Sequence, residues 1–156
     1  MADIPVEVWQ LLRDEEEHDV VILRDAQERL LPIAIGVCEA AAIWVKLAPE
    51  VAAPYLRRPW SHDLMQALLE RRGAQLERVV IDGFTNGTFY ATLHLRFRDE
   101  ELVIDSRPSD AIALMLRMNA PLLVNTEVME EAGFGLDEMP DEPDEGPDLW
   151  DEGMSP

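Results

Sequence analysis

The sequence predicts an α+β fold in which a mixed, mostly antiparallel sheet packs against apolar helices. Three observations lead to this fold class. Short apolar segments with the alternation or β-branched content of strands recur along the chain. Two segments that directly follow predicted strands have the apolar composition of buried helices. These two strand–helix pairs are also similar to each other in sequence, which indicates an internal duplication.

The predicted strands are short apolar runs that are bounded by acidic, glycine or proline-containing turns. They comprise residues 6–11, 20–23, 30–35, 76–81, 89–97, 102–105 and 122–124. Residues 20–23 (VVIL) have the composition of a fully buried strand. Pro32 indicates an edge or strand-end position, because proline donates no hydrogen bond. The dipeptide Asn86-Gly87 predicts a hairpin turn between two of the strands.

Four helices are predicted between these strands, over residues 37–48, 61–72, 110–117 and 127–132. The first is apolar on all sides over residues 40–45, which is typical of a buried helix. The second has an apolar stripe at i,i+4 spacing and ends at Gly73. Pro121 prevents the third helix from continuing, and Gly133 ends the fourth.

A weak internal duplication relates residues that are 71 positions apart. Ile33 matches Ile104, Glu39 matches Asp110, and Lys46 matches Arg117. Each half contains a strand, a turn, a second strand and an apolar helix that begins with an acid. We therefore expect two similar units whose helices lie on one face of the sheet.

The chain of 156 residues carries a formal net charge of −19, and nine of its acids follow Gly135, where there is no Lys or Arg. The preceding residues still hold 23 acids against 13 bases. A field of this sign repels nucleic acid, so simple electrostatic DNA binding is not expected. A phosphate ligand would need a local basic patch or a divalent cation.

Composition also predicts the domain boundary and the cellular compartment of the protein. Residues 1–134 form one expected domain, and residues 135–156 form an acidic tail that we expect to be disordered. Cys38 is the sole cysteine, so no internal disulfide forms and a reducing cytoplasm is expected. No apolar run is long enough to span a bilayer, and no signal peptide is recognisable, so we expect no membrane association.

The junction at residues 104–117 is the strongest candidate for a functional site. A strand ends at Asp105, and a helix begins with Asp110 after a stiff turn that contains Arg107, Pro108 and Ser109. Two carboxylates, a guanidinium and a hydroxyl are thereby fixed to rigid elements. Carboxylates that hold a divalent cation, with an arginine on the phosphate, can hydrolyse a phosphodiester.

Four segments carry a resemblance to a known family, namely residues 31–36 (LPIAIG) with Glu39-Ala40, 58–64 (RPWSHDL), 89–91 (FYA) and 104–114 (IDSRPSDAIAL). In this order they resemble the bifunctional nuclease family, formerly a family of unknown function, over about residues 6–134. The resemblance implies a compact α+β domain that often self-associates. It also implies nuclease activity on RNA and DNA.

The candidate residues are those that match the family segments and have suitable chemistry. Expected catalytic residues are Asp105, Asp110 and His62, the last as a proton carrier near neutral pH. Expected substrate-binding residues are Arg58, Arg107 and Ser109. Expected ligands for Mg²⁺ or Mn²⁺ are Glu39, Asp63, Asp105 and Asp110.

Structural interpretations of the same residues remain open. Glu39 and Asp110 suit helix starts without any function, and Arg107–Asp110 and Arg58–Asp63 can be ion pairs that hold turns. On a second hypothesis the protein is a non-enzymatic, self-associating adaptor whose acidic tail binds a basic protein. A third hypothesis makes the tail a mimic of nucleic acid that shields a basic groove near Arg57, Arg58, Arg71 and Arg72.

Overall fold

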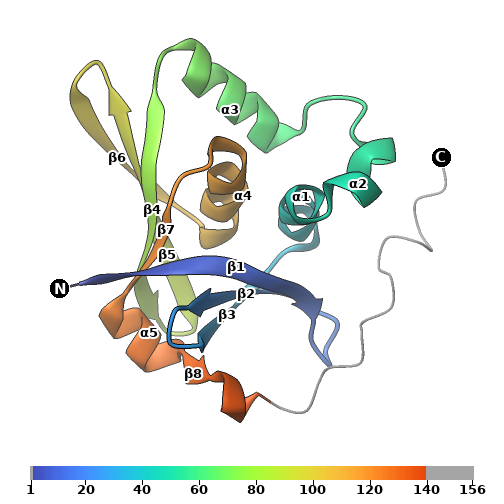
Figure 1. Ribbon diagram of the computed structural model, residues 1–156, viewed down its shortest axis with the longest axis vertical. Coiled ribbons are helices and arrows are strands. Elements are labelled where there is room, and N and C mark those ends of the chain that lie inside the picture. The colour runs from blue at the N-terminus through green and yellow to red at the C-terminus, as the bar shows by residue number, and fades with distance from the viewer. Residues whose placement is uncertain (1, 140–156) are drawn as a thin grey trace.

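The computed structural model describes residues 2–139, which form an eight-stranded sheet with helices packed against it (Figure 1). The strands are β1 (Asp3–Arg13), β2 (Asp19–Asp25), β3 (Arg29–Ile35), β4 (Gln75–Thr85), β5 (Thr88–Phe97), β6 (Glu100–Ser106), β7 (Leu122–Asn125) and β8 (Phe134–Gly135). The α-helices are α1 (Val37–Leu47), α2 (Pro49–Ala52), α3 (Ser61–Arg71), α4 (Pro108–Met118) and α5 (Thr126–Ala132). Two short 3₁₀ helices are η1 (Ala53–Tyr55) and η2 (Leu136–Glu138). The predicted α+β class is therefore confirmed.

The sheet contains the two halves that the 71-residue offset predicts. Its strand order is β6-β5-β4-β7-β1-β2-β3-β8, so each half is a three-stranded antiparallel meander followed by a helix. Adding 71 to the bounds of β3 and α1 gives the bounds of β6 and α4. Strand β7 lies between the halves, parallel to β4 and antiparallel to β1. β6 forms one edge of the whole sheet.

The main core lies between the helices and the inner face of the sheet. Figure 1 shows the two halves of the sheet at a steep angle to each other, with α1 and α4 in the angle between them. Fully buried side chains from both halves meet there, including Leu23, Leu31, Ile43, Leu95 and Ile112. α4 buries most of its apolar residues, and α1 buries Ala40, Ala42, Ile43 and Val45, so packing in the core holds the two helices in place.

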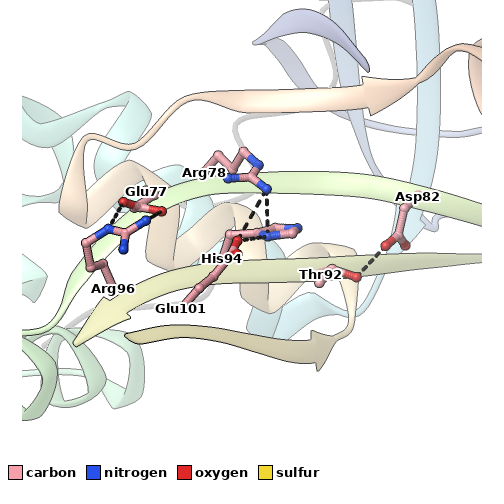
Figure 2. A network of polar contacts seen from close by, with 7 residues as sticks. All are labelled: Glu77, Arg78, Asp82, Thr92, His94, Arg96 and Glu101. Carbon is pink, nitrogen blue, oxygen red and sulfur yellow. Dashed lines mark hydrogen bonds and ion pairs between the residues drawn. The ribbon is translucent and has the colours of Figure 1, made fainter. Parts of the chain in front are cut away.

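The outer faces of the two halves differ. On the first half, Val20, Ile22 and Leu30 form a second apolar cluster, which is packed against Phe134, Leu136 and Met139. On the second half, the residues that alternate with the core positions of β5 are polar. Figure 2 shows their contacts: His94 lies between Arg78 and Glu101, Arg96 pairs with Glu77, and Thr92 bonds to Asp82.

The predicted strands and helices all exist, with ends that shift by a few residues. β1 and β4 are longer than predicted, at 11 residues each. Strand β8 pairs with β3 only at Arg29 and Leu30, so the rest of β3 is an edge of the sheet. Pro32 lies in this edge portion, as predicted. The predicted tail begins with ordered residues, because Gly135 belongs to β8 and Leu136 to η2. Its remainder, residues 140–156, lies outside the described residues. Within residues 2–139, no helix is long and apolar enough to cross a membrane.

Candidate functional site

A pocket of about 1000 Å³ opens where three helix N-termini meet. Its walls come from the starts of α1, α3 and α4, from the end of β6, and from Leu93 in the middle of β5. Five of the predicted site residues contribute to its lining: Glu39, His62, Asp105, Arg107 and Asp110. Positions far apart in the sequence are thus brought together at one surface.

A chain of polar contacts crosses the pocket. The Nε2 atom of His62 lies 3.0 Å from Oδ1 of Asp110, and Nε of Arg107 donates to Oδ2 of Asp110 at 2.7 Å. The Nη2 atom of Arg107 lies 2.9 Å from Oε1 of Glu39. One guanidinium therefore joins the acids that begin α1 and α4, and Asp110 joins that guanidinium to an imidazole.

Local sequence explains why these side chains converge. Glu39 and Asp110 occupy equivalent positions in the first turns of α1 and α4, where acids favour the positive end of the helix. Gly36 and Arg107 are the corresponding N-cap residues. A Cβ at position 36 would overlap the Glu39 carboxylate, so glycine leaves the space from which Glu39 reaches Arg107.

Burial and charge set the protonation of the central carboxylate. Burial raises the pKa of Asp110, but the hydrogen bonds and charges of Arg107 and His62 outweigh it and hold this pKa below its usual value. Hydrogen bonds to Asp110 and Glu39 raise the pKa of Arg107. Asp110 is therefore ionised at neutral pH and accepts hydrogen bonds only. His62 is 7% exposed, and its Nδ1 has no hydrogen-bond partner within residues 2–139.

Asp63, an expected metal ligand, lies outside this pocket. Its Oδ1 accepts from Nε of Arg117 at 2.7 Å, and its Oδ2 accepts from the backbone N–H of Trp60 at 2.8 Å. Arg117 is fully buried and also donates to the carbonyls of Ala42 and Ala113. The pair ties α3 to α4 and α1. Asp63 pairs with Arg117 rather than with Arg58, so the suggested Arg58–Asp63 ion pair is wrong.

The other predicted residues lie around the pocket. Arg58 lines a smaller groove of about 320 Å³ together with Lys46, Arg57 and Asp63, and Pro59 borders both spaces. Asp105 lies directly opposite Thr92 across the β5–β6 pair, so it belongs to the outer face of the sheet at the pocket rim. Ser109 lines a different groove on the far side of Arg107.

The carboxylates do not form a ready-made metal site. Glu39 and Asp110 both bind Arg107, while Asp63 binds Arg117. In the part of the chain that the structure describes, no group of three or more His, Cys, Asp or Glu side chains is placed to hold a metal ion. The expected use of Mg²⁺ or Mn²⁺ therefore stays a prediction, and the observed geometry is that of an ion-paired cluster.

Sequence reasoning missed the role of Arg117, which ties α4 to α3 and α1. Arg117 was matched to Lys46 by the 71-residue offset, but not assigned a role. The available signal was a cation one turn after Ala113 on a helix face that is otherwise apolar. Its partner was not recognisable, because Asp63 lies 54 positions earlier in the chain.

Comparisons with known proteins identify the family of the chain. The bifunctional nuclease domain, as a family, matches residues 21–137. An uncharacterized protein of Mycobacterium tuberculosis is 39% identical over 131 residues, which cover 83% of this chain and 74% of that protein. Bifunctional nuclease 1 of Oryza sativa subsp. indica and the bifunctional nuclease of Oryza minuta are 29% identical over 128 residues, 79% of this chain but 38% of each plant protein. The chain belongs to the bifunctional nuclease domain family.

Proposed function

We propose that the protein hydrolyses phosphodiester bonds of RNA, DNA or both in the pocket at the three helix N-termini. The observation that carries this proposal is the His62–Asp110–Arg107 arrangement, in which an oriented imidazole and an exposed guanidinium share one carboxylate. The side chain of Arg107 is 65% exposed, so a phosphate can approach it from the open side. The family match and the names of the rice relatives support the same reaction class.

We propose a distinct task for each group. Because ionised Asp110 only accepts, the hydrogen of His62 is held on Nε2 and Nδ1 is left with a lone pair. Nδ1 then takes a proton from water as the water oxygen bonds to phosphorus. The bond from phosphorus to the leaving oxygen breaks, and that oxygen receives a proton from the imidazolium. Arg107 stabilises the charge on the phosphate oxygens, and Asp110 positions the other two groups.

Substrate binding is proposed to extend into the groove that contains Arg58. Lys46, Arg57 and Arg58 form a local basic patch next to the pocket, despite the net charge of −19. Phosphates that flank the scissile bond can bind there. We expect Arg58→Ala to raise KM for a single-stranded oligonucleotide about tenfold with little change in kcat, because it removes binding that does not change in the transition state.

The test is cleavage of labelled single-stranded RNA and DNA by purified variants. His62→Ala, Asp110→Asn and Arg107→Ala should each lower the rate by about 100-fold or more, with melting temperatures near that of the unmodified protein. His94→Ala is the matched control, because this histidine lies on the outer face of the sheet (Figure 2) and should leave the rate unchanged. Cleavage that survives all three pocket substitutions would assign the activity to a contaminant.

Metal dependence is a separate proposal with its own measurement. The same assays are run after chelation and with added Mg²⁺ or Mn²⁺. A rate restored by either ion supports the predicted metal requirement. An unchanged rate after chelation removes that requirement and leaves the reaction to His62 and Arg107.

A self-associating, non-enzymatic module is the second candidate function, favoured by the exposed edge of the sheet. β6 presents Val103 at 60% and Ile104 at 44% exposure, and neighbouring α3 presents Leu68 at 61%. An unpaired apolar edge strand can pair with another copy. Light scattering should then show an oligomer that Val103→Lys dissociates, and a monomer at high concentration would contradict it. Binding of a basic protein by the acidic tail, and a cytoplasmic location consistent with the single free Cys38, remain proposals.

A further inference from the structure

A second groove lies on the other side of Arg107 and is not used by the proposed reaction. It has a volume of about 740 Å³ and lies between β3, the tip of the β4–β5 hairpin and the start of α4. Arg107 lines both this groove and the first pocket. A molecule that lies across Arg107 would therefore reach both spaces.

The internal duplication relates the two spaces. In the first, the end of β6 faces the start of α1, with Cys38 in the lining; in the second, β3 faces the start of α4, with Ser109 in the lining. Cys38 and Ser109 are equivalent by the 71-residue offset. The fold thus presents two similar hollows, one on each side of a shared guanidinium.

Two aromatic rings form an apolar wall of the second groove. Phe84 and Phe89 are directly opposed across β4 and β5, with ring centroids 4.4 Å apart. Both are only partly buried, so ring surface remains accessible in the groove. Asn86 and Gly87 have φ values of 52° and 77°, as in a tight hairpin turn, which holds the rings in register. Accessible aromatic surface of this kind stacks on nucleobases irrespective of sequence.

A polar side chain, that of Ser109, also lines the groove. Ser109 is 6% exposed, and its hydroxyl has no hydrogen bond to any other residue within 2–139. A hydroxyl in the lining can donate a hydrogen bond to a ligand atom or accept one from it. The groove therefore offers a flat apolar wall with a hydrogen-bonding group at its edge, which is the chemistry that a heterocyclic base requires.

Charge argues against a free anion in this groove. The carboxylate of Glu131 lies in the wall of this groove and repels an anion there. We propose that the groove, here called the base groove, binds the nucleobase next to the scissile phosphodiester, which places single-stranded nucleic acid across Arg107. This inference rests on the proposed nuclease function and names the part of the substrate that the second hollow recognises.

The first test compares two oligomers of equal length: oligothymidylate, and a chain of tetrahydrofuran units that has the same phosphates but no bases. Phe89→Leu keeps an apolar side chain and removes the stacking ring, and Ser109→Ala removes the hydroxyl. We expect Phe89→Leu to raise KM for oligothymidylate about tenfold and to leave kcat/KM for the base-free chain unchanged. Ser109→Ala should act in the same direction and more weakly.

Tyr90→Leu is the matched control, because Tyr90 alternates with Phe89 along β5, is 46% exposed and does not line the groove. It should affect neither oligomer. Equal losses for both oligomers in Phe89→Leu, or no loss for either, would overturn the base groove.

A binding measurement separates this inference from the nuclease proposal. Stacking quenches the fluorescence of 2-aminopurine, so a 2-aminopurine dinucleotide reports contact with Phe89 without cleavage. Quenching that is lost in Phe89→Leu and retained in His62→Ala supports the groove even if no cleavage occurs, in which case the nuclease proposal alone fails. Cleavage without quenching would overturn the groove and leave the nuclease proposal standing.

Discussion

The two halves of this molecule share one plan but differ in what they place at equivalent positions. In both, an antiparallel meander leads into an eleven-residue helix with an acid in its first turn. Glycine precedes α1 at position 36, whereas Arg107 occupies the same place before α4. The duplication thus places two acids, Glu39 and Asp110, at one site. Arg107, which has glycine as its counterpart in the first half, pairs with both.

A second difference lies at the other ends of the two helices. Lys46 is exposed near the end of α1, while its counterpart Arg117 is fully buried and bonds to Asp63. The outer faces differ as well, since one carries an apolar cluster under residues 134–139 and the other the exposed polar network of Figure 2. Among residues 2–139, the first half is therefore covered by a later segment of the chain, whereas the outer face of the second half is left uncovered.

Removal of Arg117 should have the largest effect on stability. Arg117→Ala leaves the Asp63 carboxylate without its cation and two buried carbonyls without a donor, so we expect the free energy of unfolding to fall by about 3–5 kcal/mol. Lys46→Ala, at the equivalent position of the first half, should change it by less than about 0.5 kcal/mol. Urea denaturation of both variants measures the difference, and equal losses would contradict the asymmetry.

A reciprocal exchange tests the outer faces. Ile22 is 3% exposed in the apolar cluster of the first half, so Ile22→Thr should cost about 2–4 kcal/mol through lost apolar burial and a buried hydroxyl. Thr92→Ile places an apolar side chain on the open face of the second half and should change stability by less than about 0.5 kcal/mol. Similar costs for the two substitutions, measured by chemical denaturation, would show that both outer faces are covered.

Low pH should weaken the ion pair between Asp63 and Arg117. Burial raises the pKa of Asp63, but the N–H of Trp60 and the guanidinium of Arg117 outweigh it and lower this pKa below 3.8. A carboxyl group whose pKa is lower in the folded state than in the unfolded state stabilises the protein when the pH is above the unfolded-state pKa. This stabilisation is lost as the pH falls through the folded-state pKa. The gap in unfolding free energy between the unmodified protein and Asp63→Asn should therefore be largest near pH 7 and narrow below about pH 4. A difference in unfolding free energy that grows as the pH falls would contradict the lowered pKa of Asp63.

Much of the fold could be predicted because its signals are local. Alternation in residues 89–97, the Asn86-Gly87 turn and the breaks at Gly73 and Pro121 each depend on neighbouring residues. The 71-residue offset also placed Glu39 and Asp110 at equivalent helix starts. That prediction is confirmed by the bounds of α1 and α4.

The pairing of charges could not be predicted, because it depends on how the helices cross. Local spacing suggested Arg58 as the partner of Asp63, yet the approach of α3 to α4 brings Arg117 to it instead. The same crossing brings His62 to Asp110 across 48 positions. Likewise, three apolar residues at 134, 136 and 139 are too weak a pattern to predict that this segment packs on the sheet. Their role is evident only from the cluster of Val20, Ile22 and Leu30 that they cover.

The central claim is that the two equivalent acids have different tasks at one pocket. The decisive measurement is the single-turnover cleavage rate of single-stranded RNA by Asp110→Asn and Glu39→Gln, with melting curves to establish folding. Asp110→Asn should lose about 100-fold or more, because an amide can hold His62 in the wrong tautomer. Glu39→Gln, which contacts Arg107 and not His62, should lose less than about tenfold. Equal losses, or full activity in Asp110→Asn, would contradict the account.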